Sequence, residues 1–169
     1  MIPFARRVLT VAILASLIGQ ASATLVAQDA PFSVYDLADY RLTPQVFEQF
    51  VRASGRIADI TAHDPVFRYA PLFTKDVALS GDAPVVAQGL TARLENHAGL
   101  SAALAEAKIT PREYAKFAIG LVAAHLAQGF VKAGVLQRVP EGAPTINVAF
   151  VNAHEAEVAA VLATLGVQD

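Results

Sequence analysis

Apolar residues recur at helical spacing along much of the chain, and the longest run of this kind extends from Thr110 to Gly134. At 100° per residue, Tyr114, Phe117 and Leu121 form one apolar line, and a second line begins at Ile119. An apolar face of this width is typical of a helix that other helices surround. The pattern therefore predicts a core helix around which the rest of the chain packs.

The two ends of this run carry residues that start and stop helices. Thr110 is suited to cap the first amide groups, Pro111 to occupy the first helical position, and Glu113 to complete a capping box. Gly134 is suited to the left-handed backbone conformation that closes a helix. The uncharged run between Lys116 and Lys132 is shorter than the roughly 20 residues that cross a membrane, which favours a core helix over a membrane span.

A second amphipathic helix is predicted from Thr43 to about Thr61. Thr43 and Pro44 repeat the pattern of a capping residue followed by proline. The helix is expected to end before Asp64-Pro65, because the residue before a proline avoids helical backbone angles. Its apolar side is expected to contain Val46, Phe47, Phe50, Val51, Ser54 and Ile57.

Three further helices complete the expected set. Asp82 is expected to cap a helix over 83–96, and Ser101 a short one through Ala107. The last helix is predicted from Asn147 to Leu165, with Gly166 at its end. Its buried stripe is expected to contain Phe150, Val151, His154, Val158, Val161, Leu162 and Leu165.

These patterns predict an all-α fold class, a single-domain bundle of about five helices. The alternative concerns 146–150, where apolar residues alternate and a short strand could precede a helix capped by Asn152.

The first residues of the chain have the pattern of a secretory signal peptide. Arg6 and Arg7 precede the apolar run from Val8 to Gly19, and Ala21-Ser22-Ala23 matches a small-x-small cleavage site. We expect cleavage before Thr24, with cleavage after Ala27 as the alternative. The other reading is an uncleaved membrane anchor, because no charge interrupts the apolar run. The expected location is periplasmic or extracellular.

The domain organisation follows from this reading. Residues 1–23 are assigned to the signal, 24–41 to an irregular lead-in, and 42–169 to the helical domain. The chain has no cysteine, so it has neither disulfides nor thioether-linked haem, and an apolar core must stabilise it. The domain after the signal is mildly acidic and has no basic cluster. This argues against nucleic acid as a partner, and membrane contact is expected only if the signal stays uncleaved.

The stretch from His63 to Asp82 is rich in aromatic residues, yet Pro65 and Pro71 interrupt any regular element in it. The pattern indicates an extended loop packed over the helices. Long aromatic loops also line binding sites, so Phe67, Tyr69 and Phe73 are candidate ligand-binding residues, against the simpler reading of a loop that closes the core.

Histidines offer the second set of candidates. No two of the four lie three or four residues apart, so no single helix presents a pair of metal ligands, and no metal site or cofactor is predicted. His125 and His154 both lie on the apolar sides of their helices. If those helices are neighbours, the two imidazoles could hold haem or a metal ion, which is the alternative function. The simpler reading is a buried neutral histidine with a hydrogen-bond partner.

No catalytic residues are assigned. The sequence has no Walker loop, no G-x-S-x-G and no H-E-x-x-H motif, and it lacks a cysteine nucleophile. A third hypothesis is a hydrolase that uses His154 and Glu157. A solvated start of a helix is the simpler reading of that segment.

Two segments, LSAALAEAKITPREY and NVAFVNAHEAE, resemble a group of small exported bacterial proteins for which no activity is known. The similarity covers about Leu100 to Leu165. It implies export and a helical fold, and it implies no catalytic residues. The function predicted from the sequence is a non-enzymatic binding or interaction module with an unknown protein or small-molecule partner.

Overall fold

The computed structural model describes residues 31–69, 72, 82–139 and 145–167, which belong to one compact unit, Pro31–Asp169. The expected signal at 1–23 lies outside these residues. Within them every regular element is a helix, so the predicted all-α class is confirmed. The helices are α1 (Val34–Ala38), α2 (Pro44–His63), α3 (Val66–Tyr69), α5 (Ala83–Asn96), α6 (Ala98–Ala107), α7 (Pro111–Lys132), α8 (Thr145–Ala153) and α9 (Glu155–Thr164).

Three elements differ from the sequence-based expectation. The lead-in is not irregular throughout, because Ser33 and Asp36 form a capping box that starts α1. The loop expected after His63 contains the short helix α3. The last helix is divided at His154, which separates α8 from α9, and the alternative of a strand at 146–150 is wrong because α8 is helical there.

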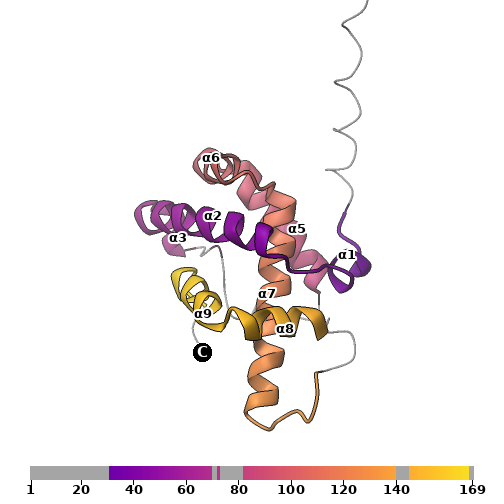
Figure 1. Ribbon diagram of the computed structural model, residues 1–169. Coiled ribbons are helices and arrows are strands. Elements are labelled where there is room, and N and C mark those ends of the chain that lie inside the picture. The colour runs from indigo at the N-terminus through magenta and orange to yellow at the C-terminus, as the bar shows by residue number, and fades with distance from the viewer. Residues whose placement is uncertain (1–30, 70–71, 73–81, 140–144, 168–169) are drawn as a thin grey trace, which may run out of the picture. The chain divides into compact units, whose positions relative to one another are not determined.

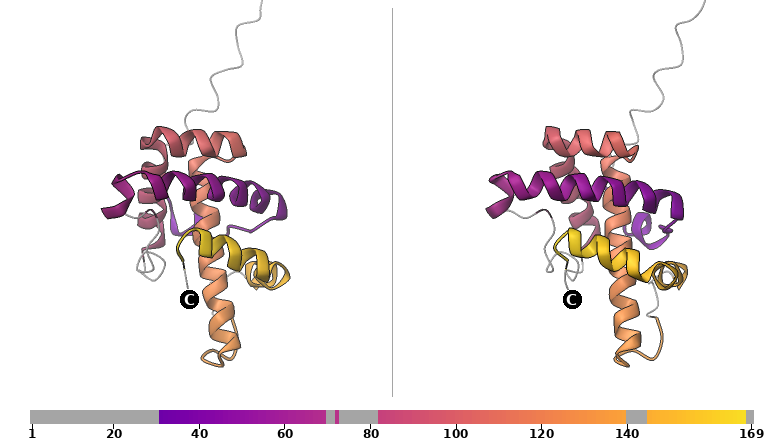
Figure 2. Two further views of the ribbon diagram at one scale, coloured as in Figure 1. Left: turned by 90° about the vertical axis from the view of Figure 1, so that its left-hand side faces the viewer. Right: turned by 60° about the vertical axis from the view of Figure 1, so that its left-hand side comes forward.

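Helix α7 is the axis of the unit (Figure 1). α5 lies alongside it, whereas α6, α2 and the α8–α9 pair cross it one after another, as both views of Figure 2 show. The last turns of α7 extend beyond these crossing helices. The arrangement confirms that the other helices pack around 110–134, although they do so crosswise.

Burial along α7 is strongest over its first four turns. The line predicted from the sequence, Tyr114, Phe117 and Leu121, is fully buried. The second line is only half-buried, and Phe130 near the end is 44% exposed. Among the described helices, α7 is long and apolar enough to cross a membrane by length and composition, with 44% of the relevant window buried inside the unit.

Aromatic side chains from α2 and α7 form the centre of the core. The Phe50 ring stacks on Tyr114 at 4.6 Å and lies 4.9 Å from the Phe117 ring, while Phe47 stacks on Phe117 at 6.0 Å. Such pairs contribute about 0.5–1.5 kcal/mol each beyond their buried area. The hydroxyl of Tyr114 is hydrogen-bonded to Ser54 at 2.9 Å, which satisfies both buried polar groups.

Most of the predicted helix ends are found. The hydroxyls of Thr43 and Thr110 accept hydrogen bonds from Val46 N and Glu113 N. At the end of α7, Gly134 has φ +69° and its N–H donates to Val131 O, while Val135 N donates to Phe130 O. This pair of bonds is the Schellman motif that the glycine predicted. Gly166 ends α9 in the same way, with φ +77°.

Three predicted caps differ. The Asp82 side chain makes no capping hydrogen bond at the start of α5. α6 begins at Ala98 rather than after Ser101, because Nδ1 of His97 accepts a hydrogen bond from Leu100 N and caps the helix there. Glu113 was predicted to complete a capping box with Thr110. Its carboxylate instead accepts a 2.7 Å hydrogen bond from the Tyr40 hydroxyl, which ties the lead-in to the start of α7.

Candidate ligand groove

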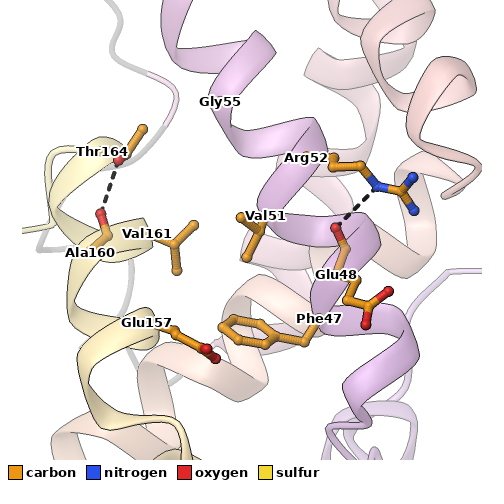
Figure 3. Close-up of a pocket in the computed structure, with 9 residues that line it drawn as sticks. All are labelled: Phe47, Glu48, Val51, Arg52, Gly55, Glu157, Ala160, Val161 and Thr164. Atoms are coloured by element: carbon orange, nitrogen blue, oxygen red, sulfur yellow. Dashed lines mark hydrogen bonds between the residues drawn. The ribbon is translucent and has the colours of Figure 1, made fainter.

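An open groove of about 700 Å³ runs between α2 and α9 (Figure 3). It is lined by Phe47, Glu48, Val51, Arg52, Gly55, Glu157, Ala160, Val161 and Thr164. Its volume falls within the range of about 300–1,000 Å³ that is usual for small-molecule sites. Of the three charged residues that line the groove, Glu157 is directed toward the Phe47 ring, whereas Glu48 and Arg52 are directed away from α9.

The apolar strip in the groove is one side chain wide on each wall. Val51 of α2 and Val161 of α9 point toward one another across it, as Figure 3 shows. Gly55 and Ala160 continue the strip with small residues, and a Cβ built on Gly55 would meet no atom within 4 Å. Val51 was predicted to belong to the buried side of α2, yet it is 40% exposed because α9 stands off from it.

One carboxylate, that of Glu157, lies at the Phe47 end of the groove. Figure 3 shows the Glu157 carboxylate directed toward the Phe47 ring and the guanidinium of Arg52 directed away from α9. Arg52 is held in this position by its Nε, which donates to the Glu48 carbonyl oxygen at 3.4 Å. The Glu48 carboxylate is likewise directed away from α9, so Glu157 is the charged side chain that faces the Phe47 ring.

His154 positions Glu157. Its Nδ1 lies 2.9 Å from Glu157 Oε2, and its ring packs at 4.6 Å on Phe150 and at 5.6 Å on Phe47. The pair lies at the first turn of α9, so a hydrogen bond from the imidazole both orders the helix start and fixes the carboxylate at the groove. A carboxylate that orients an imidazole is also one part of a general-base arrangement, which the hydrolase hypothesis requires.

A smaller hollow of about 290 Å³ adjoins the groove at Thr164, which lines both. Phe67 and Leu72 contribute to this hollow together with residues from the second half of α2 and the end of α9. Phe67 is mostly buried, and its ring lies 5.3 Å from the ring of His97. Phe67, a candidate binding residue predicted from the sequence, thus lines the hollow that adjoins the groove.

Asp64 and His97 fix this end of α2. Nε2 of His97 lies 3.0 Å from Asp64 Oδ2, and Val66 N donates to Asp64 Oδ1 at 2.9 Å. Because Nδ1 of His97 accepts the capping hydrogen bond from Leu100, the ring hydrogen is on Nε2 and is donated to Asp64. This hydrogen bond from His97, followed by the one from Val66, lowers the pKa of Asp64 below its usual 3.8.

The other predicted site residues are placed as follows. Phe73 and the side chain of Tyr69 lie outside the described part of the chain. His125 is half-buried on α7, and His154 is half-buried at the α8–α9 junction with Glu157 as its partner. In the described ranges, no three His, Asp or Glu side chains come together in a group that could hold a metal ion.

Sequence reasoning missed the groove itself. Val51 was placed on a buried stripe but is 40% exposed, and the small residues Gly55 and Ala160 were not singled out, whereas Val161 is buried as predicted. No signal in the sequence finds them, because helical periodicity gives the apolar side of α2 without showing how much of that side a neighbouring helix covers.

Comparison of the chain with family models, curated proteins and solved structures gave no match. The geometry of the groove is therefore the basis for the functional argument.

Proposed function

We propose that this protein is an exported, non-enzymatic binding module whose ligand lies in the groove between α2 and α9. The observation that carries the proposal is an open groove of about 700 Å³ with the apolar side chains Val51 and Val161 facing each other across it. Val51 is 40% exposed in this concave site, and a ligand with an apolar body would bury that surface.

Of the charged side chains that line the groove, Glu157 faces it, beside the Phe47 ring. Ligand sites commonly combine apolar walls with a small number of polar groups that orient the ligand. The rigid aromatic packing under Phe47 supports such a site, because the ring is held by Phe117 and Phe150 and cannot collapse into the groove.

A pair of matched valine variants tests this proposal. Val51→Glu places a charge inside the groove, whereas Val85→Glu places one at a 67% exposed position on α5. The uncharged apolar dye Nile red is titrated into each variant and followed by fluorescence. We expect Val51→Glu to weaken binding at least tenfold and Val85→Glu to leave it unchanged. Equal binding by all three proteins, or no binding by the unmodified protein, would overturn the proposal.

The export part of the proposal rests on the pattern of residues 1–23 and is tested by mass. The full chain is expressed in a bacterial host, and the mature protein is recovered from the periplasm. Loss of residues 1–23, or of 1–27 if cleavage follows Ala27, is the expected result. An intact chain held in the membrane fraction would contradict it and favour the anchor alternative.

Mass spectrometry of the mature protein under native conditions separates the binding module from the carrier alternative, in which His125 and His154 hold haem or a metal ion. A carrier would retain an added mass that His154→Ala or His125→Ala removes while the fold persists. The proposed module retains no haem or metal, and it responds to Val51→Glu instead.

A further inference from the structure

On the basis of the proposed function, we infer that the groove and the hollow beside it form one continuous cleft for a long unbranched alkyl chain. The length of the chain, and not the charge of its head group, sets the affinity. The observation behind this is that Thr164 of α9 lines both the groove of about 700 Å³ and the hollow of about 290 Å³.

On the α2 wall, the residues that line the two cavities follow one face of the helix. Val51 and Gly55 line the groove, and Ala58 and Ala62 line the hollow. These positions are four, three and four residues apart, so they lie in one row along α2. All four are exposed or half-buried. From Phe47 to Ala62 this wall is about 22 Å long at 1.5 Å per residue.

The opposite wall is formed by α9. Ala160 lines the groove, Leu165 lines the hollow, and Thr164 lines both. In Figure 3 the two helices run alongside each other, with Glu157 near Phe47 at one end and Thr164 at the other. The cleft is therefore long and narrow, a shape that an extended alkyl chain fills along its length.

The two hydroxyl groups along the cleft already donate within the protein. Thr61 Oγ1 donates to Ala58 O at 3.1 Å. Thr164 Oγ1 donates to Ala160 O at 2.9 Å. Because each hydroxyl hydrogen is used by the helix that carries it, a hydrocarbon chain can pass both threonines without leaving a donor unsatisfied.

The charged side chains give the cleft no preference for a charged head group. Glu157 is paired with His154 at 2.9 Å. Glu48 and Arg52 are directed away from α9. Affinity should therefore follow the apolar area that the chain buries, which grows with every methylene group that enters the cleft.

The test uses octyl, decyl and dodecyl maltoside, which share one uncharged head group, each below its micelle-forming concentration. Binding to the mature protein is measured by calorimetry. Each added pair of methylenes that the cleft buries should tighten binding about tenfold. The same affinity for all three probes would overturn the inference.

Thr164→Phe tests whether long chains reach the hollow, because a ring at this position would block the passage from the groove. Thr164 is exposed, so the change leaves the core packing intact. We expect dodecyl maltoside binding to weaken at least about tenfold and octyl maltoside binding no more than about twofold. The matched control Thr145→Phe, at an exposed position on α8, should leave both affinities unchanged. An equal loss for the two probes, or no loss for either, would contradict a cleft that continues into the hollow.

Failure of the chain-length preference and failure of the proposed function give different results. Equal binding of the three maltosides that Val51→Glu abolishes would leave the proposed groove standing and overturn the preference for long chains. Absence of binding by Nile red and by all three maltosides would overturn both.

Discussion

Asn147 joins two segments that lie more than a hundred residues apart in the sequence. Its Oδ1 accepts a hydrogen bond from Leu42 N and its Nδ2 donates one to Tyr40 O, each at 2.9 Å. The side chain is 2% exposed, so water cannot replace it at either backbone group. A single amide thus fixes the entry of the chain into α2 against the first turn of α8.

We therefore predict that Asn147→Ala destabilises the protein by about 2–4 kcal/mol, because it leaves two buried backbone groups without a partner. Urea unfolding followed by circular dichroism measures the change. Asn96→Ala, at an exposed position on α5, serves as the control and should stay within about 0.5 kcal/mol of the unmodified protein. A similar result for both variants would refute the role of Asn147.

Two glycines near the end of α7 should respond in opposite directions to the same substitution. Gly129 lies inside the helix, and a Cβ there would meet no atom within 4 Å, so Gly129→Ala should stabilise the protein by about 0.5–1 kcal/mol. Gly134 has φ +69°, so Gly134→Ala should destabilise it by about 1 kcal/mol. Thermal unfolding of the pair gives the sign of each effect directly.

At the scale of whole elements, the helices follow from local rules and their exceptions follow from contacts across the fold. Thr43, Thr110 and Gly134 act as predicted because each bonds backbone groups within a few residues of itself. His97 was missed as a cap because its ring is placed by Asp64, which is 33 residues earlier. The break at His154 was missed for the same reason, since its ring packs on Phe47 of α2.

The His97–Asp64 contact gives the end of α2 a defined pH dependence. The folded state lowers the pKa of Asp64 below 3.8, and that of Asp36 as well, mainly through the hydrogen bond from Ser33 N. A lowered carboxyl pKa contributes stability that is present above the usual value and is lost as the pH falls through the folded-state pKa. The melting temperature should therefore fall between about pH 5 and about pH 2.5.

Two variants identify the origin of that fall. Asp64→Asn should make it shallower, because the amide cannot be protonated in this range. His97→Asn keeps a capping residue but loses the hydrogen bond to Asp64. This variant should also reduce the fall in melting temperature, by less than Asp64→Asn does. If the pH profile of Asp64→Asn matches that of the unmodified protein, the contact does not set the acid response.

At the scale of the whole molecule, the all-α class and the central place of α7 could be predicted, but the groove could not. Helical periodicity shows which side of α2 is apolar and does not show how much of that side another helix covers. That depends on where α9 packs after the chain has turned at His154. Val51 consequently appeared as a core residue in the sequence and is 40% exposed in the groove, whereas Val161 is buried as predicted, at 5% exposed.

The predicted binding residues lie where the packing of α9 against α2 puts them. Phe67 was chosen for its place in an aromatic loop, and it lies in the hollow that adjoins the groove at Thr164. His125 and His154 were chosen for their apolar surroundings. His154 proved to position a groove carboxylate, a role that only the packing of α9 against α2 reveals.

The most direct test of the groove is a ¹H–¹⁵N NMR titration of the mature protein with the uncharged apolar probe Nile red. The account predicts shifts that saturate and are concentrated at α2 and α9, with Val51, Gly55 and Ala160 among the largest, and that vanish in Val51→Glu. Saturable shifts concentrated instead around Phe130 and the exposed end of α7 would contradict it, and the binding surface would have to be assigned there.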